Sequence, residues 1–226
     1  MQRNSLLKFT MTEHYEHGMK VAALAYQVGE QLGMPVSFCK KLIIAGIMHD
    51  VGKISLQEEM DEDKSLIVEE MGYIRQHPQL GYNLMRTRMR ISEDICDMVL
   101  YHHENWDGSG YPFNLEGSNI PIGACILRVC DVFCALTEKR SYRDAYPIEK
   151  ALDMMIHEIK NYNVRVFMAL QQLLHDDETG ELRLPECPVE LRGEIRQYGI
   201  EEKTCNGNEG HSAAGDGNPR LRNWID

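Results

Sequence analysis

The segment HHENWDGSGYP places two adjacent histidines, His102 and His103, before a glycine-rich loop that carries acidic side chains. Neighbouring histidines can both reach inward only near a helix end or a bend, and glycines allow close backbone approaches that a Cβ atom would block. Two interpretations fit: an ordinary helix terminus followed by a turn, or half of a metal site with a substrate-binding lip. The segment alone does not decide between them.

A second polar pair, His49 and Asp50, ends the largely apolar segment FCKKLIIAGIM. A buried ionised aspartate is costly unless another group neutralises it. The simpler interpretation is a histidine at a helix C-terminus, where the helix dipole favours positive charge. Lys53, four residues after His49, adds a cation that could face either an anionic substrate or only solvent.

Asp131 lies inside another apolar segment, ILRVCDVFCAL, and shares its helical face with Leu127 and Cys134. An aspartate on such a face needs a partner. The partner could be a divalent cation or Arg128, which lies three residues away and so on a neighbouring part of the helix surface.

Glu13 and His17 are four residues apart and therefore project from one face of a predicted helix, which continues into the apolar position of Val21. That direction points the pair inward, although surface Glu–His pairs with this spacing are also common. His77 precedes a proline at a predicted helix junction and, by itself, could equally be a partly exposed histidine near a turn.

Together, five histidines and two aspartates stand at predicted helix ends or on predicted buried faces. One mixed imidazole–carboxylate metal centre explains all of them, and such ligands suit iron, manganese or zinc. Two metals about 3.5–4 Å apart would polarise a phosphoryl group and generate hydroxide at neutral pH. The predicted ligands are His17, His49, Asp50, His77, His102, His103 and Asp131. The other histidines, interpreted as surface or structural residues, are His14, His157, His175 and His211.

Apolar residues recur every three to four positions along most of the chain, which predicts an all-α domain. Ser37 is the predicted N-cap of the second helix, and residues 55–66 are predicted to form a polar surface loop. The predicted helices cover residues 10–32, 37–48, 67–76, 79–88, 92–103, 121–138, 147–160 and 163–175. The predicted organisation is a helical domain over 1–176, a short irregular C-terminal extension over 177–202 and a disordered tail over 203–226.

The composition limits the function. A chain of 226 residues with 43% hydrophobic content can bury a sizeable core. Its net charge of −11 argues against a surface for duplex DNA or an anionic membrane, but leaves room for a small phosphorylated ligand in a local basic pocket. We see neither an apolar run of ~20 residues nor the apolar core of a secretion signal. The seven cysteines form no CxxC pair and indicate reduced thiols, so we expect a cytoplasmic protein.

The order of these motifs resembles the HD-GYP family of the HD phosphohydrolase superfamily. The matching strings are HDVGK, HP, HHENWDGSGYP and DVFCALTEKRSYR, and the resemblance covers roughly residues 13–175. It implies a compact HD-domain helical bundle as the catalytic domain. It also implies a phosphodiesterase that linearises or fully hydrolyses cyclic di-GMP with two or three divalent metal ions, most often iron or manganese.

Matching positions assign roles by this resemblance. Asp50 would bridge two metals and act with Lys53 near the scissile phosphate, and Glu13 matches a carboxylate of members that hold a third metal. Arg140 and Arg143 match a basic pair that grips ligand phosphates, and guanidinium groups suit that task. Gly110 and Tyr111 would shape the substrate lip. The implied metal ligands are Glu13, His17, His49, Asp50, His77, His102, His103 and Asp131.

Two positions depart from the family pattern. Cys134 stands where many members have an aspartate, and Cys125 replaces a frequent arginine. These changes leave open another cyclic dinucleotide, such as cyclic GMP-AMP, as the substrate. A non-catalytic nucleotide sensor is a further alternative, against which the complete ligand set argues. A homodimer and protein partners in signalling also stay open.

Overall fold

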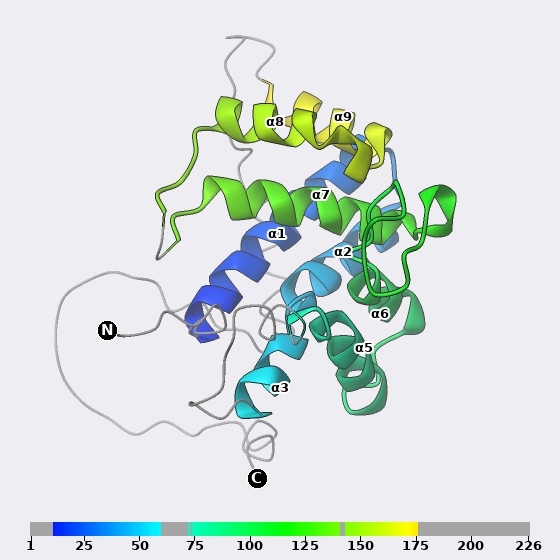
Figure 1. Cartoon of the computed structure of the whole chain (residues 1–226). Helices are drawn as coiled ribbons and strands as arrows, with labels where there is room; N and C mark the ends of the chain where they lie inside the picture. Colours follow the sequence, from blue (N-terminus) through cyan, green and yellow to red (C-terminus); the bar gives the residue numbers. More distant parts are fainter. Residues whose placement is uncertain (1–10, 60–71, 73, 141–142, 176–226) are drawn as a thin grey trace, which may run out of the picture. The chain divides into compact units, whose positions relative to one another are not determined.

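Helices form the regular structure of this chain. The computed structural model describes residues 11–59, 72, 74–140 and 143–175, all within one structural unit, Met1–Pro188. Within these ranges no residue belongs to an extended strand, so the all-α prediction is confirmed there (Figure 1). None of the described helices is long and apolar enough to cross a bilayer. The helices are α1 (Met11–Gln31), α2 (Val36–Met48), α3 (Gly52–Glu59), α5 (His77–Thr87), α6 (Glu93–Leu100), α7 (Ile122–Thr137), α8 (Ile148–His157) and α9 (Val164–Leu174), with short 3₁₀ turns at Gly117–Asn119 and Ile159–Asn161.

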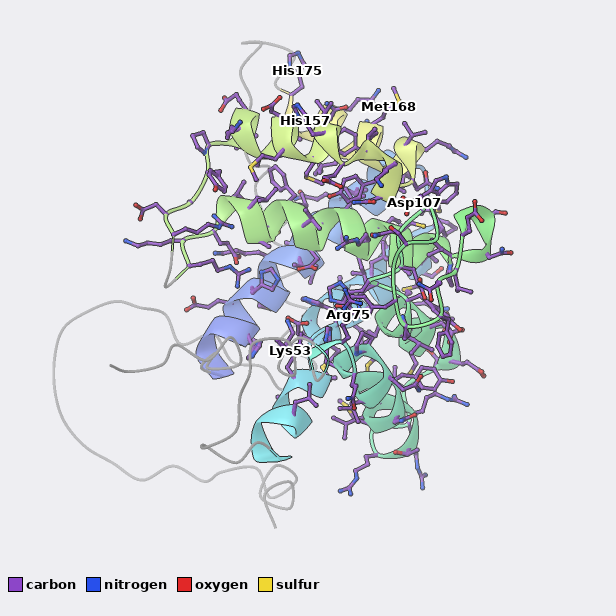
Figure 2. The ribbon with its side chains drawn as sticks, viewed as in Figure 1. Lys53, Arg75, Asp107, His157, Met168 and His175 are labelled. Carbon is purple, nitrogen blue, oxygen red and sulfur yellow. The ribbon has the colours of Figure 1, made fainter. Side chains whose placement is uncertain are left out.

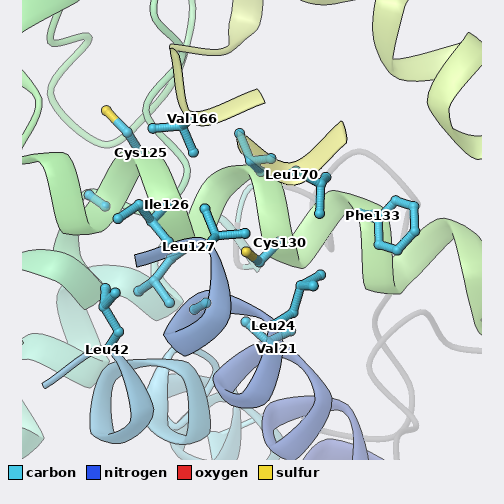
Figure 3. Close-up of a cluster of buried hydrophobic side chains, with 14 of the residues drawn as sticks. Val21, Leu24, Leu42, Cys125, Ile126, Leu127, Cys130, Phe133, Val166 and Leu170 are labelled. Carbon is cyan, nitrogen blue, oxygen red and sulfur yellow. The ribbon is translucent and has the colours of Figure 1, made fainter. Parts of the chain in front are cut away.

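The hydrophobic core is built around α7, which packs against α1, α2, α6, α8 and α9. In Figure 3, Val21 and Leu24 of α1 and Leu42 of α2 lie on one side of α7, and Val166 and Leu170 of α9 lie on the other. Burying a side chain of this size stabilises a fold by about 1.5–3 kcal/mol. Because apolar contacts hold α7 on both sides, the polar side chains that it carries have fixed positions.

Glycines bring α1 and α2 into backbone contact. A Cβ atom added to Gly46 would lie 2.6 Å from Cα of Ala22, and one added to Gly18 would lie 2.9 Å from a carbonyl oxygen of α2. Only glycine permits such approaches. As a result, His17 of α1 meets His49 at the end of α2, with their ring centroids 5.3 Å apart.

A second close contact joins the beginnings of α3 and α5. A Cβ atom added to Gly52 would lie 2.0 Å from the carbonyl oxygen of His77 and 2.6 Å from the backbone nitrogen of Gly81. Gly52 is therefore required where the two backbones touch. This contact places Asp50 and Lys53, on either side of Gly52, beside the first residue of α5.

Most predicted helices are present, and the errors lie at their ends. Ser37 lies inside α2, which begins at Val36 without a side-chain cap, so the capping prediction was wrong. The predicted loop was wrong over residues 55–59, which belong to α3, because packing against α5 stabilises a helix there. The helix predicted over 92–103 ends at Leu100, since the chain turns before the paired histidines. Predictions for residues 60–71, 73 and 176–226, including the rest of the predicted loop, lie outside the described residues.

Candidate metal centre

Asp50 lies at the centre of a buried group of imidazoles and carboxylates. Its Oδ1 atom lies 3.3 Å from Nε2 of His77, and its Oδ2 atom lies 3.4 Å from Nε2 of His49. Because its two oxygens face different histidines, Asp50 has the geometry of a bridging ligand. Two sets of potential ligand atoms share it, and within each set the atoms lie within 4.8 Å of one another: Asp50, His77, His102 and His103, and His17, His49 and Asp50.

Three of the histidines are oriented by backbone carbonyl groups at helix ends. The Nδ1 atoms contact the carbonyl oxygens of Gly46 (His49, 2.7 Å), Ile74 (His77, 2.6 Å) and Val99 (His102, 2.5 Å). Each acceptor lies three residues before its histidine, and the last carbonyls of a helix have no partner within the helix. Since a carbonyl oxygen only accepts, each Nδ1 carries a proton, and in the neutral ring the lone pair lies on Nε2.

This arrangement brings lone pairs together. Nε2 of His77 lies 3.3 Å from Nε2 of His102. Burial lowers the pKa of His77 to about 4. Burial, together with the imidazoles of His49 and His77, holds the pKa of His102 well below its usual value, so both rings are neutral at pH 7. Two facing lone pairs repel unless a cation lies between them, and neutral imidazole is the form that binds metal.

Nε2 of His49 and Oδ1 of Asp50 are among the buried polar atoms of the described residues that make no hydrogen bond within the protein, and both face the cluster. Burial by itself would raise the pKa of Asp50, but Lys53 and His49 hold it well below its usual value, so the carboxylate is ionised. An anionic carboxylate beside the neutral imidazoles of His77 and His102 is the donor set of a divalent transition metal. The residues present therefore fit a metal ion.

Asp131 completes the cluster from α7. Its Oδ1 atom lies 2.9 Å from Nε2 of His17 and 3.7 Å from Nε2 of His49. The alternative partner considered from the sequence, Arg128, instead donates from Nε and a terminal nitrogen to Oδ1 of Asn105, at 3.1 and 2.9 Å. Asp131 therefore faces the imidazoles, as a metal ligand would.

His17 is oriented by a side chain that the sequence analysis did not single out. Nδ1 of His17 lies 2.9 Å from Oε2 of Glu138. Burial by itself would lower the pKa of His17, but Asp131 and Glu138 outweigh it and raise that pKa to about 9. A sequence signal existed, because Glu138 follows Asp131 by seven residues and so returns to the same face two helical turns later.

The loop after α6 is tied down by a buried glutamate. The carboxylate of Glu104, which is 2% exposed, accepts hydrogen bonds from the backbone nitrogens of Phe113 (2.7 Å) and Leu115 (3.1 Å). A Cβ atom added to Gly110 would lie 2.2 Å from the backbone nitrogen of Asn105. Gly110 therefore packs against the chain that follows the paired histidines, and the loop folds back over them.

Tyr111 forms one wall of the cluster. Its ring stacks on the imidazole of His103, with centroids 4.7 Å apart and planes 22° apart. The guanidinium carbon of Arg75 lies 5.3 Å from the centre of the Tyr111 ring, within the range of a cation–π contact. The predicted lip residue thus lies directly against a predicted ligand.

Lys53, Arg140 and Arg143 differ in their surroundings. Nζ of Lys53 lies 2.6 Å from Oδ2 of Asp50, at the cluster. A terminal nitrogen of Arg140 lies 3.3 Å from Oε2 of Glu138. The guanidinium of Arg143 donates to carbonyl oxygens at and beyond the end of α7, those of Ala135, Leu136 (3.0 Å) and Asp144 (3.0 Å). Arg143 therefore caps α7 in this structure, whereas Arg140 contacts Glu138 and its terminal nitrogen also lies 3.5 Å from Nδ1 of His17.

The structure also gives the positions of most of the remaining histidines. His14, interpreted as a surface or structural residue, contributes Nδ1 at 4.0 Å from Oδ2 of Asp50, so the sequence analysis missed its position at the rim of the cluster. His157 and His175 are exposed and appear on α8 and after α9 in Figure 2, apart from Lys53. Glu13 belongs to α1, but its side chain lies outside the described residues, as does His211.

One class of all-α metal-binding domain is characterised by consecutive His and Asp residues that meet further histidines from other helices. The family model described as HD domain matches residues 3–166. This chain belongs to the HD domain family, and the HD-GYP resemblance seen in its motifs is confirmed.

Three known proteins illustrate the similarity. The chain is 31% identical over 168 residues to "Cyclic di-GMP phosphodiesterase PA4108" of Pseudomonas aeruginosa, covering 73% of this chain and 41% of that protein. It is 32% identical over 152 residues to "3'3'-cGAMP-specific phosphodiesterase 1" of Vibrio cholerae, covering 64% and 34%. Among solved structures, "Bd1817, a HDG"Y"P protein" from Bdellovibrio bacteriovorus aligns with a TM-score of 0.60 at 17% identity, covering 76% of this chain and 56% of that one, which supports the fold alone.

A relative from Thermotoga maritima, named "Cyclic di-GMP phosphodiesterase", is 29% identical over 222 residues, covering 97% of this chain. This chain spans 57% of that protein's length. The chain thus covers less than two thirds of the length of the curated relatives from Pseudomonas aeruginosa, Thermotoga maritima and Vibrio cholerae.

Proposed function

We propose that this chain is a metal-dependent phosphodiesterase that hydrolyses a cyclic dinucleotide, with cyclic di-GMP as the preferred substrate. The observation that carries the proposal is the position of Asp50, whose two carboxylate oxygens face two different sets of histidines. That geometry suits a pair of metal ions, and metal pairs serve phosphoryl transfer and hydrolysis. Relatives named as phosphodiesterases for cyclic di-GMP support the substrate.

The proposed ligands divide between the two sets. Asp50, His77, His102 and His103 would hold one ion, and His17, His49, Asp50 and Asp131 would hold the other. Bound divalent metals would polarise a phosphoryl oxygen and supply a hydroxide at neutral pH. Iron or manganese is the proposed metal, because mixed imidazole and carboxylate donors suit both.

Two cations would orient the substrate. Lys53 lies against Asp50 and would bind the phosphate beside the metal centre. Arg140, held at Glu138, would contact a phosphate oxygen from the α7 side. Tyr111, stacked on His103, would border the site and limit the positions that the dinucleotide can take.

A second substrate deserves direct comparison because of Cys134. Its thiol is buried near Asp131 and Glu138, and burial, reinforced by these two carboxylates, raises its pKa, so it stays neutral. A neutral thiol cannot bind a guanine edge as a carboxylate would. Relatives named as specific for 3'3'-cGAMP exist beside those named for cyclic di-GMP, which makes 3'3'-cGAMP the alternative substrate.

The test is hydrolysis by the purified chain, loaded anaerobically with Fe²⁺ or Mn²⁺. Cyclic di-GMP, 3'3'-cGAMP and cyclic di-AMP are offered separately, and products are separated by chromatography. We expect the highest kcat/KM for cyclic di-GMP. Higher kcat/KM for 3'3'-cGAMP would transfer the assignment to that substrate, and no hydrolysis of any of them would refute the proposed function.

Two histidine variants provide a test of the metal site and its matched control. His49→Ala removes a ligand at the centre of the cluster, and His157→Ala removes a histidine whose side chain is 74% exposed on α8. We expect the first change to abolish turnover and lower bound metal, and the second to alter neither.

The organisation of the chain also stays a proposal. We propose residues 1–176 as the catalytic domain and residues 203–226 as dispensable for it. A truncation after Glu202 that keeps full turnover would support this division, and loss of turnover would contradict it. We also propose a cytoplasmic location, which fractionation of cells that produce the tagged protein tests.

A further inference from the structure

His17 occupies a different structural position from the three histidines that backbone carbonyls orient. It lies within α1, with more than a full helical turn on each side. Backbone carbonyls in the middle of a helix already accept the hydrogen bond of the residue four positions later. His17 therefore has no unused carbonyl three residues before it, and its orientation must come from a side chain on another element.

Glu138 supplies that side chain from α7. It is the residue that immediately follows α7, its side chain is 12% exposed, and its Oε2 atom lies 2.9 Å from Nδ1 of His17. The opposite ring nitrogen, Nε2, lies 2.9 Å from Asp131 in the cluster. One carboxylate thus lies behind the imidazole and the other lies on its metal-facing side.

Cations hold Glu138 in turn. Nζ of Lys20 lies 3.2 Å from Oε1, and a terminal nitrogen of Arg140 lies 3.3 Å from Oε2. The two cations thus lie one at each carboxylate oxygen and hold the side chain against His17. An anionic acceptor makes a stronger hydrogen bond than a neutral one.

We propose that Glu138 is a positioning residue that directs His17 toward the metal centre and links it to Arg140. By accepting a hydrogen bond from Nδ1–H, Glu138 keeps that proton on Nδ1, so that Nε2 is the ring nitrogen left to bind metal. Outer partners of this kind typically change metal affinity by about 10–100-fold when removed. The inference rests on the proposed metal function, and it gives Glu138, which lies inside the string DVFCALTEKRSYR, a role that neither the motif resemblance nor the relatives' names assign.

The competing explanation is electrostatic. Glu138 could strengthen metal binding only through its negative charge, wherever the carboxylate stood. The two explanations differ in whether the reach of the side chain or its charge matters, and two conservative variants separate them.

Glu138→Gln keeps the length of the side chain and an oxygen that accepts from Nδ1, but it removes the charge. Glu138→Asp keeps the charge but withdraws the oxygen from His17 by about one C–C bond. Glu138→Ala removes both, and Glu149→Ala, an exposed glutamate in the first turn of α8, is the matched control.

The experiment measures the Mn²⁺ dissociation constant of the full chain and its variants by anaerobic titration. Thermal unfolding of the metal-free proteins is measured in parallel. We expect Glu138→Ala to weaken Mn²⁺ binding by about 10–100-fold. We expect Glu138→Gln to bind Mn²⁺ more tightly than Glu138→Asp, because only the glutamine reaches Nδ1, and Glu149→Ala to bind like the unmodified chain.

The reverse order, with the aspartate variant binding more tightly than the glutamine variant, overturns the proposal in favour of charge alone. Unchanged Mn²⁺ affinity in every Glu138 variant also overturns it. If Glu138→Ala does not fold, the order of the other two variants still decides. A chain that binds Mn²⁺ but hydrolyses no cyclic dinucleotide refutes the proposed function, while the order of affinities still judges the role of Glu138.

Discussion

The candidate metal centre combines histidines that the backbone orients with one that a side chain orients. His49, His77 and His102 donate from Nδ1 to carbonyl oxygens at helix ends or junctions. His17 lies within α1 and is held by Glu138 instead. The same chemical requirement, a proton held at Nδ1 so that Nε2 is the nitrogen available to a metal, is therefore served in two ways.

The difference matters for what mutation can change. A carbonyl oxygen at a helix end is present whatever residue carries it, so the first group depends on where helices stop and how closely their backbones approach. The second arrangement depends on the identity of one residue. We therefore expect the backbone-oriented histidines to respond to changes in packing, and His17 to respond to changes in side-chain chemistry.

Removing the group that both sets share should have the largest effect. Asp50→Asn keeps the shape of the side chain but loses the charge that bridges the sets. We expect turnover to fall to background and metal content to fall for both ions, beyond the ~100-fold typical of an outer-shell change. Elemental analysis with turnover measurements tests this, and a variant that loses only one ion would show that Asp50 serves one set alone.

Disturbing the helix packing that positions the backbone-oriented histidines should have the next largest effect. In Gly52→Ala the new methyl group would lie 2.0 Å from the carbonyl oxygen of His77, so α3 and α5 must separate. Overpacking of this kind costs about 1–3 kcal/mol and sometimes more. We expect a melting temperature several degrees lower and reduced metal content, measured by thermal unfolding and elemental analysis.

Gly72→Ala is the control for that change. Gly72 is exposed, helical and has no other heavy atom within 4 Å of an added Cβ, so its replacement should be neutral or slightly stabilising. If Gly52→Ala melted like Gly72→Ala and kept its metal, the contact between α3 and α5 would not be what positions His77.

The two arginines after α7 lie near the Glu138 side chain that orients His17, and they have different contacts. Arg140 contacts Glu138, whereas Arg143 donates to carbonyls at the end of α7. The resemblance gave both a role in gripping phosphates, and their contacts now predict different consequences. Charge-assisted hydrogen bonds contribute about 1.5–3 kcal/mol each.

Arg140→Ala should therefore raise KM by about 10–100-fold with little change in thermal stability. Arg143→Ala should lower stability by about 1–3 kcal/mol, because the end of α7 loses its cap. Steady-state kinetics and thermal unfolding measure the two effects. Arg86→Ala, at a side chain that is 40% exposed on α5, is the control for loss of a guanidinium. Equal KM values for the Arg140 and Arg143 variants would remove the distinction.

Much of the fold follows from local sequence patterns. Apolar periodicity placed α1, α7 and α9 within one residue of their observed ends. It missed α3, whose residues lack a strong apolar pattern and are stabilised by packing against α5. Apolar periodicity identifies a helix face that packs against the core. A short polar helix that packs against one neighbour therefore shows only weak periodicity.

The residues of the candidate site were also only partly predictable from the sequence. The predicted histidines and aspartates with described side chains meet in one cluster, because their types and their places at helix ends carried the signal. Glu138 and His14 were missed. His14 belongs to no recognised string, and Glu138 lies inside DVFCALTEKRSYR without an assigned role; their roles depend on how α1 approaches α7 and the end of α2, which only the packed structure defines.

The smallest expected effect concerns Glu13, on the same helix as His17. Its spacing of four residues places it one turn earlier on the same face of α1. A further carboxylate beside the ionised Asp50 and Asp131 would be repelled unless another cation lay between them. We therefore predict a third metal ion that Glu13 and His17 help to hold, where it could assist the attacking water or the leaving group.

Glu13→Gln keeps the shape of the side chain and should lower the stoichiometry from three ions to two, with the fold unchanged. Glu16→Gln, at an exposed position on α1, is the matched control and should keep three. Anaerobic reconstitution followed by elemental analysis measures the count. Two ions in the unmodified chain, or three in the Glu13 variant, would reject the third site. In that case Glu138, rather than Glu13, would be the carboxylate that supports Asp50 and Asp131 in the binding of metal by His17.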